Sequence, residues 1–244
     1  MKIAVAGKGG AGKTTVSGTV ARHLSRAGHS VLALDADTNP MLGISLGVGP
    51  EETYRLLAVR QGLDDGTIEH QQSVEALVEA FGVDAPDGVR LVVALREARA
   101  DPGCICCGVT PQQLLGELEG EGRTVVCDME AGVGAIVRAG NADVVLVVVE
   151  PSVKSIDVGA RVIAAAVEAE TEVIVVANRV RGEADLEAIR AELGDRATAV
   201  VPEDPVIARA DVEGRAPIDI DSGAPGVSAL SVLAERLVAQ PAHA

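Results

Sequence analysis

Continuous apolar runs recur along this chain and constrain its fold more than any other feature. They occupy residues 3–6, 31–34, 91–94, 125–127, 144–149, 173–177 and 199–201. Several lack the apolar–polar alternation of a strand that faces water on one side, which indicates strands covered on both faces. Aromatic residues make up 1% of the chain, so the core must consist of Val, Ala, Leu and Ile, which suits buried parallel strands.

Stretches of helical length and spacing lie between these runs. The clearest are residues 14–27, 153–168 and 184–193. The repeated order strand, helix, strand predicts an α/β fold with a doubly wound, mostly parallel sheet between two layers of helices. No internal repeat, linker or change of composition marks a second domain, so we expect residues 1–244 to form a single domain.

Two segments follow this pattern less clearly. Residues 43–88 are less regular, with one predicted helix at 67–81 and turn residues at 84–88, and we expect them to lie beside the sheet. Residues 228–239 predict a final amphipathic helix whose polar face carries Glu235 and Arg236. Because that face lacks a cationic cluster, we expect the helix to pack on the fold.

The formal net charge of −15 limits the partners of the chain. A surface that neutralises nucleic acid or anionic lipid needs an excess of basic residues, so we expect neither partner. Lys2 is followed by a short apolar run and then by glycines. We therefore expect no signal peptide and no membrane span, and a cytoplasmic location.

A glycine-rich motif follows the first predicted strand and opens the first predicted helix. Residues 7–15 read Gly-Lys-Gly-Gly-Ala-Gly-Lys-Thr-Thr and match the phosphate loop G-x-x-x-x-G-K-[ST] in its proper context. Its glycines turn backbone amides toward phosphates, and the helix N-terminus adds positive potential. We expect Lys13 to contact the β and γ phosphates and Thr14 to bind Mg²⁺. The expected contacts of ATP or ADP are Gly9, Gly10, Ala11, Gly12, Lys13, Thr14 and Thr15.

Lys8 is a second lysine inside this loop, which an ordinary phosphate loop does not require. The run from Lys8 to Thr14 resembles the deviant phosphate loop of the ATPases that include MinD, ParA, the nitrogenase iron protein, the arsenite pump ATPase and the nickel-insertion ATPase CooC. In that family the extra lysine reaches across a nucleotide-sandwich dimer to the partner's phosphates. The resemblance implies an ATP-dependent homodimer with Lys8 and Lys13 as catalytic lysines. On chemistry alone, a solvated loop lysine is equally natural at Lys8.

Acidic residues follow two of the strands. Asp37, in the run Asp-Ala-Asp-Thr-Asn-Pro, resembles the family's first switch, which implies a catalytic aspartate at the Mg²⁺ site that orients the attacking water. Asp128, in the run Asp-Met-Glu-Ala-Gly, resembles the second switch, which implies that Asp128 holds the Mg²⁺ shell and that the Gly132 amide lies near the γ phosphate. Aspartates at strand ends also cap helices, so each motif alone has a structural alternative.

Polar residues after the last two predicted strands are candidates for base contacts. Asn178 ends the run 173–177, and Pro202 and Glu203 follow the next run. In the deviant-loop family an Asn-Arg or Asn-Lys pair at the first place hydrogen-bonds adenine, and residues after the following strand border the base. The resemblance therefore implies adenine contacts at Asn178, Pro202 and Glu203. The alternative for Asn178 is an ordinary turn residue.

Three of the four cysteines occupy one short loop, at Cys104, Cys106 and Cys107. This spacing is poor for a set of structural disulfides. Two Cys-x-Cys pairs that face each other across a twofold axis would supply the four soft ligands of a metal site at a dimer interface. Buried free thiols, or a redox-active pair at Cys106 and Cys107, are the alternatives.

Within the deviant-loop family, the sequence resembles the CooC proteins more than their relatives. Those proteins assist nickel insertion into carbon monoxide dehydrogenase and bind metal through Cys-x-Cys pairs in their dimer. The resemblance extends from residue 1 to about 201 and implies Ni²⁺ or Zn²⁺ at Cys104 and Cys106, with a carbon monoxide dehydrogenase-like client. The extra thiol of Cys107 departs from the pattern and leaves open which cysteines form the ligand pair.

The other relatives fit less well. The nitrogenase iron protein has a cluster cysteine just after the second switch, whereas residues 133–139 contain none. MinD ends in a cationic membrane-targeting helix, ParA needs a basic surface, and the arsenite pump ATPase has two tandem halves. The sequence therefore favours a homodimeric, Mg²⁺-dependent ATPase that serves a metalloenzyme. The alternatives are a MinD- or ParA-like switch with structural or redox cysteines and, less favoured, a small-molecule kinase or synthetase.

Overall fold

The computed structural model describes the chain except residues 38, 65–73, 94–121, 133–141, 197 and 240–244. Its strands form one eight-stranded sheet in the order β3-β4-β2-β5-β1-β6-β7-β8. The strands are β1 Lys2–Gly7, β2 Val31–Ala36, β3 Val83–Asp84, β4 Arg90–Val93, β5 Thr124–Met129, β6 Val144–Val149, β7 Glu172–Val180 and β8 Thr198–Pro202. Neighbouring strands run parallel except for the short β3, which is antiparallel to β4.

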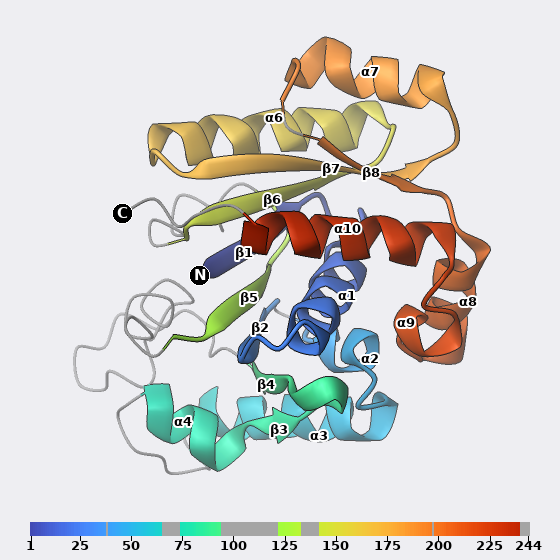
Figure 1. The fold of residues 1–244 in the computed structure, drawn as a ribbon. Coiled ribbons are helices and arrows are strands. Elements are labelled where there is room, and N and C mark those ends of the chain that lie inside the picture. The colour runs from blue at the N-terminus through green and yellow to red at the C-terminus, as the bar shows by residue number, and fades with distance from the viewer. Residues whose placement is uncertain (38, 65–73, 94–121, 133–141, 197, 240–244) are drawn as a thin grey trace.

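Helices cover both faces of this sheet (Figure 1). Helices α4, α6 and α7 contribute to the core on one face, and α1, α2, α3 and α10 to the core on the other. Their bounds are α1 Lys13–Arg26, α2 Leu42–Leu46, α3 Pro50–Asp64, α4 Val74–Phe81, α6 Val153–Glu168, α7 Glu183–Leu193 and α10 Pro225–Ala239. The 3-10 helix η1 Pro86–Gly88 precedes β4, and α8 Pro205–Glu213 and α9 Pro217–Ile220 follow β8.

Successive residues of the central strands alternate between the two cores. In β1, Ala4 and Ala6 belong to the core under α6 and α7, whereas Ile3 and Val5 belong to the core under α1 and α10. All four side chains are completely buried, as expected of a strand covered on both faces. The predicted α/β fold, with a doubly wound and mostly parallel sheet between two helical layers, is confirmed.

The structure differs from the sequence-based expectation mainly in residues 43–88. In place of one helix, this stretch contains α2, α3, α4, η1 and β3. The expected helix at 67–81 corresponds to α4, which is described from Val74 onward. Helix α3 escaped the periodicity argument because its apolar residues are spread around the helix rather than gathered on one face. No helix in the described ranges is long and apolar enough to cross a membrane.

Candidate functional site

The predicted phosphate loop joins the carboxyl end of β1 to the N-terminus of α1. The Ala11 N–H donates to the Lys8 carbonyl at 3.2 Å, and the Val16 N–H donates to the Gly12 carbonyl at 3.0 Å. Helix α1 therefore starts inside the motif, at Lys13. The first backbone amides of the helix and the positive end of its dipole are thus available to an anion at the loop.

Packing requires glycine at two positions of this loop. A Cβ on Gly7 would lie 2.3 Å from the carbonyl oxygen of Val148 in β6. A Cβ on Gly12, whose φ is +97°, would lie 2.3 Å from Nδ2 of Asn178. That amide nitrogen donates to the carbonyl of Ala11 at 2.8 Å, and Asn178 is 7% exposed. The end of β7 therefore supports the phosphate loop directly.

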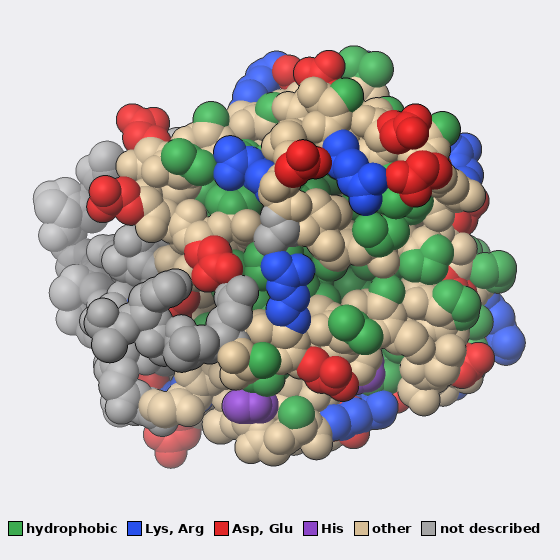
Figure 2. All heavy atoms as spheres, turned by 45° about the horizontal axis from the view of Figure 1, so that its top comes forward, with side chains coloured by type: hydrophobic (Ala, Val, Ile, Leu, Met, Phe, Trp, Pro, Cys, Tyr) green, Lys and Arg blue, Asp and Glu red, His purple; other side chains and the backbone are tan. Residues whose placement is uncertain are grey.

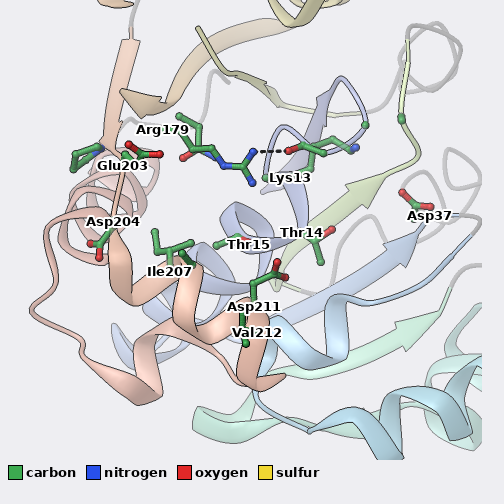
Figure 3. Close-up of a pocket in the computed structure, with 17 residues that line it drawn as sticks. Lys13, Thr14, Thr15, Asp37, Arg179, Glu203, Asp204, Ile207, Asp211 and Val212 are labelled. Carbon is green, nitrogen blue, oxygen red and sulfur yellow. Dashed lines mark hydrogen bonds between the residues drawn. The ribbon is translucent and has the colours of Figure 1, made fainter. Parts of the chain in front are cut away.

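A cavity of about 700 Å³ lies over the loop (Figure 3). In Figure 3, Asp37 lies on one side of Thr14, and Glu203 and α8 lie on the other side. Ligands of open α/β sheets bind in the crevice at the carboxyl ends of the strands, which is where this cavity is found. The lining residues are Gly9, Gly10, Gly12, Lys13, Thr14, Thr15, Asp37, Ala131, Asn178, Arg179, Pro202, Glu203, Asp204, Ile207, Ala208, Asp211 and Val212.

Two buried carboxylates lie on adjacent strands next to this loop. Asp35 of β2 and Asp128 of β5 are register partners, and each is 1% exposed. Burial, together with the charge of Asp128, raises the pKa of Asp35 to about 8, and burial raises the pKa of Asp128 to about 6. Asp35 accepts the N–H of Leu42 at 2.7 Å and that of Asp37 at 3.2 Å. It thereby fixes the backbone that carries Asp37.

Asp128 has one oxygen available for a further ligand. Its Oδ1 accepts the Ser17 hydroxyl at 3.1 Å, but its buried Oδ2 has no hydrogen-bond partner among the described residues. An unpartnered buried carboxylate oxygen is costly, and a hard cation such as Mg²⁺ would satisfy it. Mg²⁺ is usually held by one or two side chains together with substrate phosphates. Asp128 and the neighbouring Thr14, which interacts with this carboxylate, fit that requirement.

Asp37 of the predicted first switch and Gly132 of the predicted second switch are held by local hydrogen bonds. Asp37 lines the cavity, and its Oδ1 accepts the N–H of Asn39 at 2.9 Å. Gly132 has a φ of 109° and donates its N–H to the Gly7 carbonyl at 3.3 Å. In this conformation the amide that was expected to face a γ phosphate is directed at the phosphate loop, and Ala131 lines the cavity instead.

Asn178, Pro202 and Glu203 line the cavity, and Pro202 and Glu203 come shortly before α8 in the chain. Ile207, Ala208 and Val212 of α8 add apolar surface there, and Asp211 adds a carboxylate (Figure 3). Asp204 has a structural role, because its side chain accepts the Val206 N–H that starts α8 and the Gly226 N–H that starts α10. This end of the cavity therefore combines apolar side chains with carboxylate acceptors.

The cysteine loop, with Cys104, Cys106 and Cys107, lies outside the described residues. Cys127 is buried in β5, where its thiol lies 3.2 Å from the sulfur of Met129 and burial raises its pKa. Such a thiol is unreactive and belongs to the core. In the described part of the chain, no cluster of three or more His, Cys, Asp or Glu side chains could hold a metal ion by itself.

Charges of both signs share the face of the molecule in Figure 2, where Lys and Arg side chains alternate with Asp and Glu. At the phosphate loop the positive charges are Lys8, Lys13 and Arg179. Lys13 is 6% exposed. Arg179 donates to the Gly10 carbonyl at 3.0 Å, as the dashed line in Figure 3 shows. Three cations thus gather at the loop of a strongly acidic chain, while the cavity over it is also lined by the carboxylates of Asp37, Glu203, Asp204 and Asp211.

Comparison with known proteins agrees with this geometry. Residues 2–218 match the model of the CbiA family, described as the CobQ/CobB/MinD/ParA nucleotide binding domain. The chain belongs to this family. The resemblance to the deviant-loop ATPases is therefore confirmed, and this CbiA-family chain is an ATP-binding protein of the MinD/ParA type.

Individual relatives of this CbiA-family protein include CooC. An uncharacterized ATP-binding protein of Methanocaldococcus jannaschii is 31% identical over 92% of this chain and 93% of its own length. The carbon monoxide dehydrogenase accessory protein CooC of Rhodospirillum rubrum is 33% identical over 66% of this chain and 67% of its own length. Among solved structures, the cell division ATPase MinD of Pyrococcus furiosus superposes with a TM-score of 0.71 at 25% identity, covering 98% of both chains.

Several residues of the site were not anticipated from the sequence. Ser17 lies within α1 and Asp35 within β2. Their hydrogen bonds to Asp128 and to the backbone of Asp37 depend on how these elements pack. Glu150 directly follows β6, and Arg179 lies in the last two residues of β7. The rule that ligands gather at the carboxyl ends of parallel strands, which pointed to Asp37 and Asp128, applies equally to these two positions and could have found them.

Proposed function

We propose that this protein hydrolyses ATP in a nucleotide-bridged homodimer. The observation that carries the ATPase part of the proposal is the buried Oδ2 of Asp128, unpartnered among the described residues, beside Thr14 and the phosphate loop. The homodimer is supported by the second lysine of the loop, Lys8, through the family resemblance. In this proposal Lys13 binds the β and γ phosphates, and Thr14 and Asp128 hold Mg²⁺. Bound Mg²⁺ would neutralise charge that develops on the phosphates. Asp37 orients the attacking water, and Lys8 reaches the phosphates of the partner.

The nucleotide base belongs to the α8 end of the cavity in this proposal. Pro202 and the apolar residues of α8 provide a surface for the flat face of adenine, and Glu203 provides an acceptor for its amino group. Asn178 already uses its Nδ2 to hold Ala11, so its carbonyl oxygen is the atom available to the base. Gly132 moves its amide from the Gly7 carbonyl to the γ phosphate when ATP binds.

The cellular role that we propose is that of a CooC-type maturation ATPase. The support is the similarity to CooC together with the three-cysteine loop. Cys104 and Cys106 of two protomers would bind Ni²⁺ or Zn²⁺ as cargo, with Cys107 as a further thiol, and nucleotide turnover would open and close this site. The client would be a carbon monoxide dehydrogenase-like enzyme, and the reactions would take place in the cytoplasm.

The test is the metal content and molar mass of the reduced protein, with and without ATP and Mg²⁺. We expect about one Ni²⁺ or Zn²⁺ per dimer, the number that four thiolates from two protomers can hold. The double substitution C104A/C106A should abolish binding, whereas Cys127→Ala, at a buried cysteine outside the loop, should leave it unchanged. Stoichiometric binding that survives C104A/C106A would refute the metal site.

A nucleotide-switched interaction protein is the second candidate, and the likeness to MinD of Pyrococcus furiosus favours it. It predicts a protein that dimerises with ATP but binds no metal at stoichiometric amounts. A neighbouring gene for a nickel enzyme would favour the maturation role, and a neighbouring partition or septation gene would favour the switch. Activation of a nickel enzyme by the purified protein, ATP and Ni²⁺ separates the two directly.

A further inference from the structure

Glu150 lies at the carboxyl end of β6 and contacts two cations of the phosphate-loop region. Its Oε1 lies 3.5 Å from Nζ of Lys8, and its Oε2 accepts a hydrogen bond from Nη1 of Arg179 at 3.2 Å. Each cation also donates to a carbonyl of the loop, Lys8 to Gly9 at 3.2 Å and Arg179 to Gly10 at 3.0 Å. One carboxylate therefore holds both side chains against the loop of their own protomer.

The Glu150 side chain is itself fixed. Its Oε1 also accepts the Ser152 hydroxyl at 3.3 Å, and its backbone N–H donates to the hydroxyl of Ser155 at 3.1 Å. Ser155 is completely buried at the start of α6. The side chain of Glu150 is 21% exposed. A carboxylate ordered in this way has already lost most of its rotamer freedom, so its ion pairs cost less entropy than those of mobile surface residues.

The backbone of Arg179 is shaped to reach this carboxylate. Its φ is +57°, a left-handed conformation that a residue with a Cβ seldom adopts. The pairing of β7 with β8 is irregular between Ala177 and Val180, which bends the strand at this point. Strained backbone of this kind persists where the surrounding structure enforces it, commonly at functional sites.

A carboxylate next to a phosphate loop opposes the binding of polyphosphate, because like charges repel. Glu150 therefore calls for a role other than nucleotide affinity. We propose that Glu150 is a positioning residue: it retains Lys8 within its own protomer until nucleotide phosphates on a second copy of this chain draw Lys8 away. This inference rests on the proposed ATP-dependent dimer and adds the contact that restrains its formation.

The dimerisation constant measures this restraint. A partly exposed ion pair shifts an equilibrium by up to about 5-fold, and each dimer breaks two of them. Glu150→Gln should therefore tighten the dimer formed with Mg²⁺ and a non-hydrolysable ATP analogue by about 2- to 25-fold. The matched control is Asp157→Asn, which removes an equal charge from an exposed pair with Arg161 on α6. An E150Q dimer no tighter than the D157N dimer overturns the proposal.

A second readout tests the contact inside the protomer. Without nucleotide, the Lys8 amine should react faster with an acetylating reagent in E150Q than in the wild type, with the exposed Lys154 on α6 as the internal reference. Equal rates overturn the positioning role whatever the oligomeric state. If the wild-type protein stays monomeric with the ATP analogue, the proposed dimer is contradicted, and so is the transfer of Lys8 from Glu150 to the phosphates of the second copy. Equal unfolding midpoints for E150Q and wild type exclude misfolding as the cause of either effect.

Discussion

Replacing Gly12 by alanine tests how the structure holds the phosphate loop. The new Cβ would lie 2.3 Å from Nδ2 of Asn178, at a φ of +97°. The left-handed backbone costs a residue with a Cβ about 1–2 kcal/mol. Displacing Asn178 removes its hydrogen bond to the buried Ala11 carbonyl, which costs about a further 1–2 kcal/mol. We therefore expect G12A to lower the free energy of unfolding by about 2–4 kcal/mol.

The matched control is Gly10→Ala. Gly10 also has a positive φ, of +81°, but a Cβ there meets no atom within 4 Å. G10A should therefore show the backbone cost alone, about 1–2 kcal/mol. The difference between G12A and G10A measures the clash with Asn178.

Urea unfolding of a double-mutant cycle provides the assay. If Gly12 and Asn178 compete for the same space, N178A should relieve the clash, so the cost of G12A in the N178A background should fall by about 1–2 kcal/mol. Binding of a fluorescent ATP analogue should weaken in G12A, because Ala11 and the neighbouring loop amides move. If the destabilisation of the double variant equals the sum of the two single destabilisations to within about 0.5 kcal/mol, as for independent sites, the proposed clash between Gly12→Ala and Asn178 is refuted.

Three further predictions follow from the described contacts. The Arg22 side chain is 2% exposed and lies between Asp87 and Asp219. Arg22→Met should lower the free energy of unfolding by about 3 kcal/mol, because two carboxylates lose a buried partner. The control Arg26→Met, at a side chain 38% exposed, should lower it by less than about 1 kcal/mol in urea unfolding. Lys13→Ala should abolish ATP binding, measured by calorimetry. Lys8→Ala should still bind ATP as a monomer but should lose ATP-dependent dimerisation, measured by light scattering. Loss of ATP binding in both variants would refute separate roles for the two lysines. Burial lowers the pKa of His23, whose Nε2 is buried without a partner among the described residues. Between the two pKa values His23 is protonated in the unfolded chain but neutral in the folded chain, so the free energy of unfolding of the wild type should fall as the pH drops below about 6.5. His23→Gln should reduce this fall in urea titrations. An equal fall in H23Q and wild type would contradict the role given to His23.

Parallel strands and the phosphate loop could be predicted from the sequence because each depends on neighbouring residues. The seven expected strands are all present, although residue 94 lies outside the described ranges. Short elements that depend on their surroundings escaped prediction. Helix α2 has five residues and β3 has two, too few for a hydrophobic period to appear.

Within the candidate site, the sequence identified residues that lie next to recognisable motifs, such as Lys13, Asp37 and Asp128. It assigned Asn178 to the base from resemblance, which stays a prediction, and the structure adds that its Nδ2 holds the phosphate loop. It did not single out Glu150 or Arg179, although both lie at the carboxyl ends of parallel strands, because a charged residue there is by itself equally compatible with a solvated charge.

The sequence by itself therefore determined the doubly wound fold and a loop able to bind phosphates. Both arise from local information: apolar periodicity, and glycines that let consecutive amides converge. Only the tertiary structure decided what surrounds the loop. The Asn178–Ala11 hydrogen bond spans 167 residues and the Lys8–Glu150 pair spans 142. Contacts of that range depend on strand order and on the bend at the end of β7, which no local pattern encodes.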